Sequence, residues 1–134
     1  MRLMELWSPI RAHAEWIVLL RESLYGHGPL TPAIASDEER CELGQWLKDR
    51  QPVYGHLPEY QLAEQVHHEF HRRASYCLHL AKSGRRAQAL AEAGENSELR
   101  RLSRQLVKTL QRLKRRVADI ENDGLARSIE DRPG

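Results

Sequence analysis

The feature that most constrains the fold is a run of apolar residues near the carboxyl end, spaced alternately by three and four. The run consists of Leu99, Leu102, Leu106, Leu110, Leu113, Val117 and Ile120. This spacing places side chains on one face of an α-helix and is typical of bundle seams and coiled coils. The other face of the segment is charged. The sequence therefore predicts one long amphipathic helix whose apolar face must be covered by other helices.

Two helices are predicted in the first half of the chain. Ser8 and Pro9 indicate the first start, with serine as the N-cap and proline at the first helical position, and Gly26 indicates the end. Its apolar stripe is predicted to be Ile10, Ala14, Ile17, Leu20 and Leu24. Ser36 and Glu39 resemble a capping box, so the second helix is expected to begin there and to stop before Pro52.

The third helix is predicted to open at Pro58 and to break at Gly84. Its periodic face comprises Tyr60, Ala63, Val66, His67, Phe70, His71, Ala74, Cys77, Leu78 and Ala81. A short additional helical segment is expected over Ala87–Ala93, ended by Gly94, and the last long helix is expected from Ser97 onward.

The pattern contains no strand, and 134 residues suffice for one domain. We therefore predict an all-α fold, an antiparallel four-helix bundle with a short extra helical segment. The domain is expected to span residues 8–122, and the polar residues 123–134 are expected to form a disordered tail.

Composition narrows the cellular setting. No window approaches the ~18 apolar residues that a membrane span needs, and the amphipathic start does not resemble a signal peptide. The two cysteines, Cys41 and Cys77, do not indicate a disulfide framework. We expect a soluble cytoplasmic protein.

The net charge of +2 conceals a basic block. Residues 72–118 carry thirteen Lys/Arg against three Asp/Glu. This block raises an alternative function, a basic helical adaptor that binds nucleic acid or a protein partner without metal. However, the block lacks interleaved aromatic residues and any recognised nucleic-acid motif, and its charges fit the solvated face of an amphipathic helix. Nucleic acid is therefore the weaker expectation.

The third helix carries the motif His67-x-x-x-His71. Residues four apart lie one above the other on a helix, so both imidazoles can reach one metal ion. Such pairs are most often solvated helix faces, and the motif alone is weak. Two further candidates, His13 and Cys41, come from the first and second helices. Three imidazoles and one thiolate form a closed tetrahedral set that suits Zn²⁺ and disfavours magnesium and calcium.

The remaining histidines and the second cysteine are interpreted as non-ligands. His68 falls on a different helix face, His27 and His56 lie in predicted loops, and His79 lies two turns beyond His71. Cys77 is expected to pack in the core, although a redox role for it stays open. No phosphate-cradling loop and no nucleophile–base constellation is present, so no enzymatic activity is expected.

The order and spacing of these residues resemble the chemoreceptor zinc-binding domain. The family pattern appears as His13-Ala-Glu-Trp16, then twenty-four residues, Cys41-Glu-Leu43-Gly44-Gln-Trp46, then twenty residues, and His67-x-x-x-His71. The resemblance covers roughly residues 8–120. It implies a helical bundle that binds one Zn²⁺ through His13, Cys41, His67 and His71.

The resemblance also implies a setting for the domain. Members of this family are bacterial signalling modules, usually homodimeric, joined to chemoreceptor helices in chemotaxis or to a diguanylate cyclase. Zinc occupancy, or oxidation of the zinc-bound cysteine, alters their output. This chain has no room for an output domain, so we expect either a freestanding module that acts on a signalling partner or a module that only binds zinc. Trp16 and Trp46 are expected to wall the site, and Gly44 to allow a close approach beside Cys41.

Overall fold

The computed structural model describes the backbone of residues 4–130 and the side chains of residues 8–124. Within that range the chain forms six α-helices and one 3₁₀ turn, η1, without a strand. The all-α prediction is therefore confirmed. The elements are α1 (Met4–Leu24), α2 (Pro32–Ser36), η1 (Glu38–Arg40), α3 (Glu42–Tyr54), α4 (Pro58–Lys82), α5 (Arg86–Glu92) and α6 (Glu98–Glu130).

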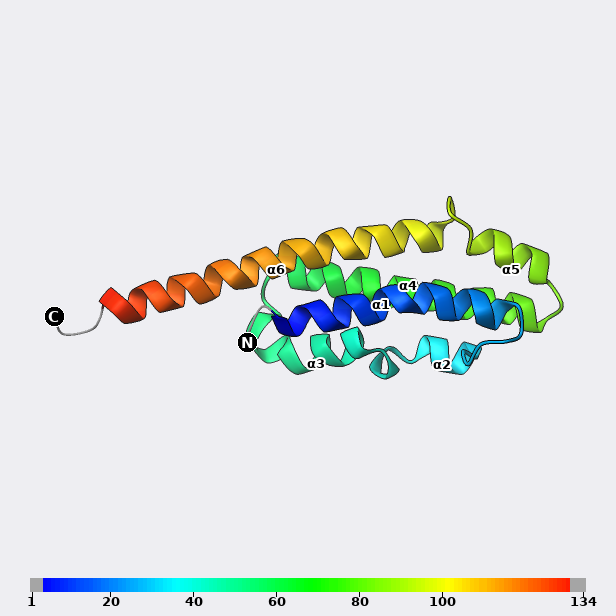
Figure 1. Cartoon of the computed structure of the whole chain (residues 1–134), viewed down its shortest axis with the longest axis horizontal. Coiled ribbons are helices and arrows are strands. Elements are labelled where there is room, and N and C mark those ends of the chain that lie inside the picture. Colours follow the sequence, from blue (N-terminus) through cyan, green and yellow to red (C-terminus); the bar gives the residue numbers. More distant parts are fainter. Residues whose placement is uncertain (1–3, 131–134) are drawn as a thin grey trace.

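The elements form an up-and-down bundle in which successive long segments run antiparallel (Figure 1). The short elements α2 and η1 lead into α3, and together they occupy the place of a single second helix that runs back along α1. Helix α4 then returns beside α1, and α6 runs back along α4. Among the elements described, α4 is central, because it packs against α1, α2, α3, α5 and α6.

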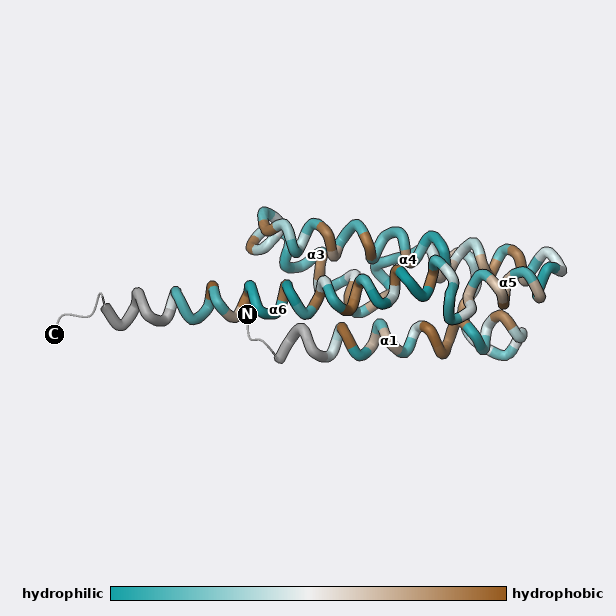
Figure 2. The backbone as a smooth tube through the Cα atoms, turned by 90° about the horizontal axis from the view of Figure 1, so that it is seen from above, coloured by the Kyte–Doolittle hydropathy of each residue, from teal (hydrophilic) through white to brown (hydrophobic). Residues whose placement is uncertain are grey.

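The apolar faces of the helices meet in one core. Apolar residues recur at intervals along α1, α4 and α6, separated by polar ones (Figure 2). The predicted seam of α6 is buried from Leu99 to Val117. Ile120 was predicted to belong to the same seam, but it is 39% exposed. The carboxyl-terminal part of α6 extends past the end of the bundle (Figure 1).

The predicted start of the first helix is wrong. Helix α1 begins at Met4, and Pro9 lies inside it. Ser8 does not cap a helix; its hydroxyl donates to Glu42 Oε1 on α3 at 2.9 Å. Proline at this position removes one backbone hydrogen bond from the helix. Pro9 is buried, so packing favours the continuous helix over the local start signal.

The predicted second helix is also wrong in its bounds. Asp37, rather than Ser36, caps the turn that follows, because its carboxylate accepts the N–H of Glu39 at 3.1 Å. Residues 38–40 form only the 3₁₀ turn, and α3 starts after Cys41. Helix α3 then continues through Pro52 to Tyr54, whose ring is buried in the core. Burial of that ring offsets the backbone hydrogen bond lost at the proline.

The other predicted helix boundaries lie closer to the observed ones. Helix α4 opens at Pro58 as expected, and Gly84 follows its end with φ +83°, a conformation that favours glycine. The hydroxyl of Ser97 accepts the N–H of Arg100 at the start of α6. Helix α6 runs past residue 122 to Glu130. Residues 131–134 of the predicted tail lie outside the described residues, and the domain boundary at 122 stays a prediction.

Candidate metal centre

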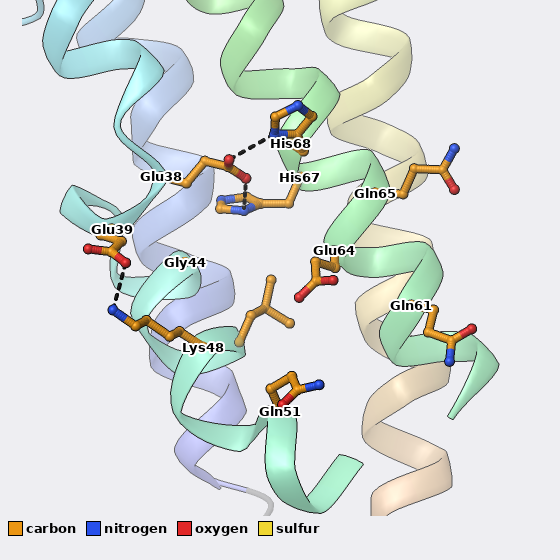
Figure 3. A pocket seen from close by; sticks show the side chains of 11 residues that line it. Glu38, Glu39, Gly44, Lys48, Gln51, Gln61, Glu64, Gln65, His67 and His68 are labelled. Carbon is orange, nitrogen blue, oxygen red and sulfur yellow. Dashed lines mark hydrogen bonds and ion pairs between the residues drawn. The ribbon is translucent and has the colours of Figure 1, made fainter. Parts of the chain in front are cut away.

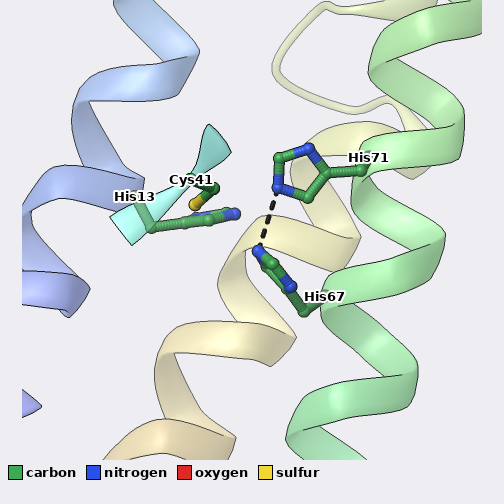
Figure 4. Close-up of side chains that lie close together, drawn as sticks. All are labelled: His13, Cys41, His67 and His71. Atoms are coloured by element: carbon green, nitrogen blue, oxygen red, sulfur yellow. Dashed lines mark hydrogen bonds between the residues drawn. The ribbon is translucent and has the colours of Figure 1, made fainter. Parts of the chain in front are cut away.

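The four predicted ligands converge in the interior of the bundle. His13 comes from α1, Cys41 from the junction between η1 and α3, and His67 and His71 from α4 (Figure 4). One potential ligand atom from each side chain lies within 4.8 Å of those of the other three. All four residues are buried, and the three histidines are at most 3% exposed.

Helix α1 presents His13 on its buried face. Within residues 8–24, the part of this helix whose side chains are described, the buried residues are Pro9, His13, Trp16, Leu20 and Leu24. The predicted stripe included Ala14, which is exposed, and did not include His13. The buried face is therefore rotated toward His13. A prediction based on apolar residues alone leaves out a histidine, yet His13 lies in the middle of the buried face.

The backbone before α3 positions Cys41. The N–H of Cys41 donates to the carbonyl of Glu38 at 3.2 Å, and Cys41 itself is extended, with φ −92° and ψ 131°. Gly44 makes this packing possible. A Cβ atom at this position would lie 1.8 Å from the carbonyl oxygen of Glu38 and 3.3 Å from Cε1 of His67. The close approach predicted at Gly44 is thus to the 3₁₀ turn and to His67.

Hydrogen bonds fix the ring orientation of the histidine pair on α4. His71 Nδ1 lies 2.9 Å from the carbonyl oxygen of Ala35, which can only accept, so Nδ1 carries the proton. His67 Nδ1 faces a carboxylate oxygen of Glu38 at 3.5 Å, which favours a proton on that nitrogen as well. Both Nε2 atoms then carry lone pairs. They face each other at 2.9 Å (Figure 4).

Protonation of His71 does not relieve this contact near neutral pH. Burial, together with the neighbouring His67, lowers the pKa of His71 to about 4. Two neutral imidazoles whose lone pairs point into the same small volume repel each other. A cation bound by both nitrogens replaces that repulsion by two favourable bonds.

His13 supplies a third nitrogen. Its Nε2 is buried without a hydrogen-bond partner among the described residues. Burial, with smaller contributions from His67 and His71, lowers the pKa of His13 well below its ordinary value. An unpaired buried polar atom costs roughly 1–3 kcal/mol, and a metal bond to Nε2 removes that cost.

Cys41 completes the donor set. Burial raises the pKa of its thiol, while the nearby backbone N–H groups of Gly44 and Leu43 oppose this effect. A metal ion would convert the thiol to a thiolate despite its burial, because a coordinating thiol is deprotonated outright.

The donor set fits zinc. Zn–N bonds of ~2.0–2.1 Å and a Zn–S bond of ~2.3 Å imply tetrahedral edges of about 3.3–3.7 Å between ligand atoms. The ligand atoms here all lie within 4.8 Å of one another, and the closest histidine pair lies at 2.9 Å. Small side-chain adjustments bring both values into the tetrahedral range. The nitrogen and sulfur donors disfavour magnesium and calcium, which take oxygen.

Aromatic rings surround the four side chains. Trp16 meets His71 edge-on with ring centroids 4.6 Å apart, and the ring of Phe70 lies 4.5 Å from that of His13. Trp16 therefore lies in the wall of the site. Trp46 is buried on α3, and the Arg50 guanidinium carbon lies 6.0 Å from the centre of its ring. Its contribution to the wall stays a prediction.

The residues interpreted as non-ligands lie elsewhere. His27, His56, His68 and His79 are exposed. Cys77 is fully buried in the core, as expected, and burial raises the pKa of its thiol to about 11. None of these five belongs to the group of converging ligand atoms among the described residues.

Sequence reasoning missed Glu38. Its carboxylate contacts both His67 and His68. The side-chain hydrogen bond from His67, with a smaller contribution from His68, lowers the pKa of Glu38 to about 2 against the opposing effect of burial. In the sequence this residue looked like an ordinary acid in the first turn of a helix. The only signal for another role was its place three residues before Cys41.

Taken together, the bundle and the buried His₃Cys group define a helical metal-binding domain. A comparison with protein-family models gives the particular family: residues 13–78 match the chemoreceptor zinc-binding domain. This segment, which carries all four candidate ligands, belongs to that family, and zinc is its cofactor. No curated protein and no solved structure matches the chain. No helix among the described residues is long and apolar enough to cross a membrane.

Proposed function

We propose that this protein is a zinc-dependent sensory or regulatory domain whose ion is held by His13, Cys41, His67 and His71. The observation that carries the proposal is the convergence of four buried ligand atoms within 4.8 Å of one another. The Nε2 atoms of His67 and His71 face each other at 2.9 Å, and Nε2 of His13 is buried without a partner among the described residues. The match of residues 13–78 to a zinc-binding family supports the same ion.

The donor set favours regulation over catalysis. Catalytic zinc keeps one coordination position for water or substrate, whereas four protein ligands close a tetrahedral site. In the proposed centre, His13, His67 and His71 bind as neutral imidazoles and Cys41 as a thiolate. Bound zinc would link three parts of the fold: α1, α4 and the segment that precedes α3. Gain or loss of the ion would therefore change how these parts are held together.

Metal content tests the proposal directly. The native chain, Cys41→Ala and Cys77→Ala are purified without added zinc, and zinc is measured by atomic emission. We expect about one zinc per chain in the native protein and in Cys77→Ala, and a strong reduction in Cys41→Ala. Cys77→Ala is the matched control, because it removes the other buried thiol. A native chain that neither carries zinc nor takes it up would refute the proposal.

The proposed regulatory input is oxidation of the zinc-bound thiolate. A peroxide transfers one oxygen to Cys41 Sγ, giving a sulfenic acid, and its second oxygen leaves as water. This removes a strong ligand from the centre. We expect dilute peroxide to release zinc, detected with a chromogenic chelator, and a thiol reductant to allow rebinding. Retention of zinc while Cys41 is oxidised, as judged by mass spectrometry, would argue against this input.

The proposed output is contact with another protein, and homodimerisation is the first form to test. The carboxyl-terminal end of α6 extends past the bundle (Figure 1), and Ile120 on this helix is 39% exposed. An amphipathic helix without a neighbour favours association with a second copy or a signalling partner. Light scattering coupled to size exclusion should give twice the chain mass for the native protein. Ile120→Glu should shift it toward one chain, whereas Val18→Glu on α1 should not.

The alternative remains a basic adaptor. Lys108 and Arg112 lie exposed on α6 and carry the case for an anionic partner. Against it, Arg116 and Arg101 on the same helix are paired with Glu59 and Glu98. Binding of a labelled oligonucleotide that weakens steeply with salt would favour the adaptor.

A further inference from the structure

An acidic residue links the buried centre to the surface. The carboxylate of Glu38 lies on the wall of an open groove between α3 and α4, which is also lined by His67, His68 and Glu64 (Figure 3). One carboxylate oxygen lies 3.5 Å from Nδ1 of the buried His67. The other lies 2.8 Å from Nδ1 of His68, whose side chain is 54% exposed.

We infer that Glu38 is a positioning residue of the zinc centre: its carboxylate orients the His67 imidazole and supplies a negative charge beside the bound ion. This inference rests on the proposed function, because it concerns the same centre. Nothing in the sequence motif includes Glu38.

The first support is the orientation of His67. A ring nitrogen that faces a carboxylate carries the proton, so the opposite nitrogen, Nε2, is left as the donor to the metal. Here Nδ1 of His67 faces Glu38, and Nε2 faces His71. His68 holds the second carboxylate oxygen and so limits the rotation of the group.

The second support is the backbone of the same residue. The carbonyl of Glu38 accepts the N–H of Cys41 at 3.2 Å. A Cβ atom on Gly44 would overlap that carbonyl, so the turn sits directly against α3. One residue therefore touches two ligands that come from different elements, His67 through its side chain and Cys41 through its backbone.

The third support is charge. A divalent ion with one thiolate and three neutral imidazoles leaves a net charge of +1 in the interior. Burying an uncompensated charge is costly, and a nearby opposite charge reduces that cost. Glu38 supplies one negative charge in contact with His67, which brings the balance of the centre to zero.

The test compares zinc affinities of four full-length proteins by competition with a chelator: native, Glu38→Ala, Glu38→Gln and Glu39→Gln. Glu39 is the matched control, because it lies in the same turn but pairs with Lys48. We expect Glu38→Ala to weaken zinc binding about 10- to 100-fold, as is typical for loss of a group that orients a ligand. Glu38→Gln keeps an acceptor oxygen without the charge and should fall between Glu38→Ala and the native protein. Glu39→Gln should match the native protein.

A second readout separates positioning from stability. The cobalt-loaded proteins are compared by visible absorption, and the metal-free proteins by thermal unfolding. A positioning role predicts altered cobalt bands in Glu38→Ala, whereas a purely structural role would lower only the unfolding temperature. Unchanged zinc affinity and unchanged cobalt bands in Glu38→Ala, or an equal loss of affinity in Glu39→Gln, would overturn the inference. Absence of zinc binding in the native protein would instead refute the proposed function itself.

Discussion

The two cysteines are both buried, but their surroundings give them different chemistry. Cys41 lies among three imidazoles, whereas Cys77 lies in the hydrophobic core and does not belong to the converging group among the described residues. Burial, reinforced by Glu92 and opposed by Arg73, raises the pKa of Cys77 to about 11. Since only the thiolate is strongly nucleophilic, Cys77 should be nearly inert in the folded protein.

This difference predicts the alkylation behaviour of Cys77. At pH 8 a thiol of pKa about 11 is ionised in roughly one molecule per thousand. We expect iodoacetamide to label Cys77 very slowly in the zinc-loaded native protein, with the rate rising about tenfold per pH unit between pH 8 and 10. Peptide mass spectrometry would give the rate. Protein unfolded in urea is the control and should react as an ordinary thiol; equal rates in the two states would contradict the prediction.

Tyr60 makes a polar contact inside the core that one substitution can remove while the aromatic ring is kept. Its ring is 1% exposed, and its hydroxyl donates to the carbonyl of Leu47 on α3. Tyr60→Phe leaves that carbonyl without this partner, so we expect a loss of about 1–2 kcal/mol in the free energy of unfolding. Urea denaturation would measure it. Tyr76→Phe, at a ring that is 43% exposed, is the control and should change stability by less than about 0.5 kcal/mol.

At the scale of elements, the junction between η1 and α3 is the tightest place near the centre. A methyl group at Gly44 would overlap the carbonyl of Glu38 and press on His67. Gly44→Ala should therefore push the turn away from α3, at a cost of about 1–3 kcal/mol, and weaken zinc binding as well. Chemical denaturation and chelator competition measure the two effects.

Gly124 is the control for the Gly44→Ala substitution, because an added methyl group at Gly124 has open space around it. It lies within α6, and a Cβ atom there would meet nothing within 4 Å. Gly124→Ala should stabilise the helix by up to about 1 kcal/mol, through helix propensity alone, and leave zinc affinity unchanged. If Gly44→Ala changed neither the free energy of unfolding nor the zinc affinity, the turn at residues 38–40 would have moved without cost, which would contradict the prediction for Gly44.

The helices also show how much of the fold could be predicted from the sequence. The faces of α4 and α6 were predicted almost residue by residue, because both helices are long and their apolar spacing is regular. The start of α1 was predicted wrongly, and the second helix was predicted to run unbroken through Cys41, where the structure has a break. In both places a local capping signal was outweighed by packing: Pro9 is buried inside α1, and the chain turns at residues 38–40 so that Cys41 can face α1 and α4.

The candidate site, too, could be predicted from the sequence only in part. The convergence of His13, Cys41, His67 and His71 could be predicted, because residue types and spacing carry the information about the metal. The partners of the imidazoles could not. Ala35 contributes a backbone carbonyl, which any residue could supply, and Glu38 acts on His67 across twenty-nine positions of sequence. Such contacts depend on the path of the turn, and no periodic pattern encodes that path.

For the whole molecule, the proposed zinc centre and the main core would be separate sources of stability. The seam between α4 and α6, from Leu99 to Val117, is buried independently of the four ligands. The metal would add links from α1 and Cys41 to α4. A bundle with so large an apolar core should therefore stay helical without zinc, unlike a zinc finger, whose folding requires the metal.

Removal of zinc should accordingly lower the unfolding temperature while leaving the helices in place. Stabilisation by a ligand is about 2.7 kcal/mol when its free concentration is 100 times the dissociation constant. For a domain of 134 residues this corresponds to a shift of roughly 10 °C. Circular dichroism at 222 nm, recorded at 20 °C and then through a thermal scan with chelator or excess zinc, gives both quantities. Cys41→Ala should show no shift on zinc addition. Loss of most helical signal at 20 °C on chelation would mean that the metal, rather than the leucine seam, holds the bundle together.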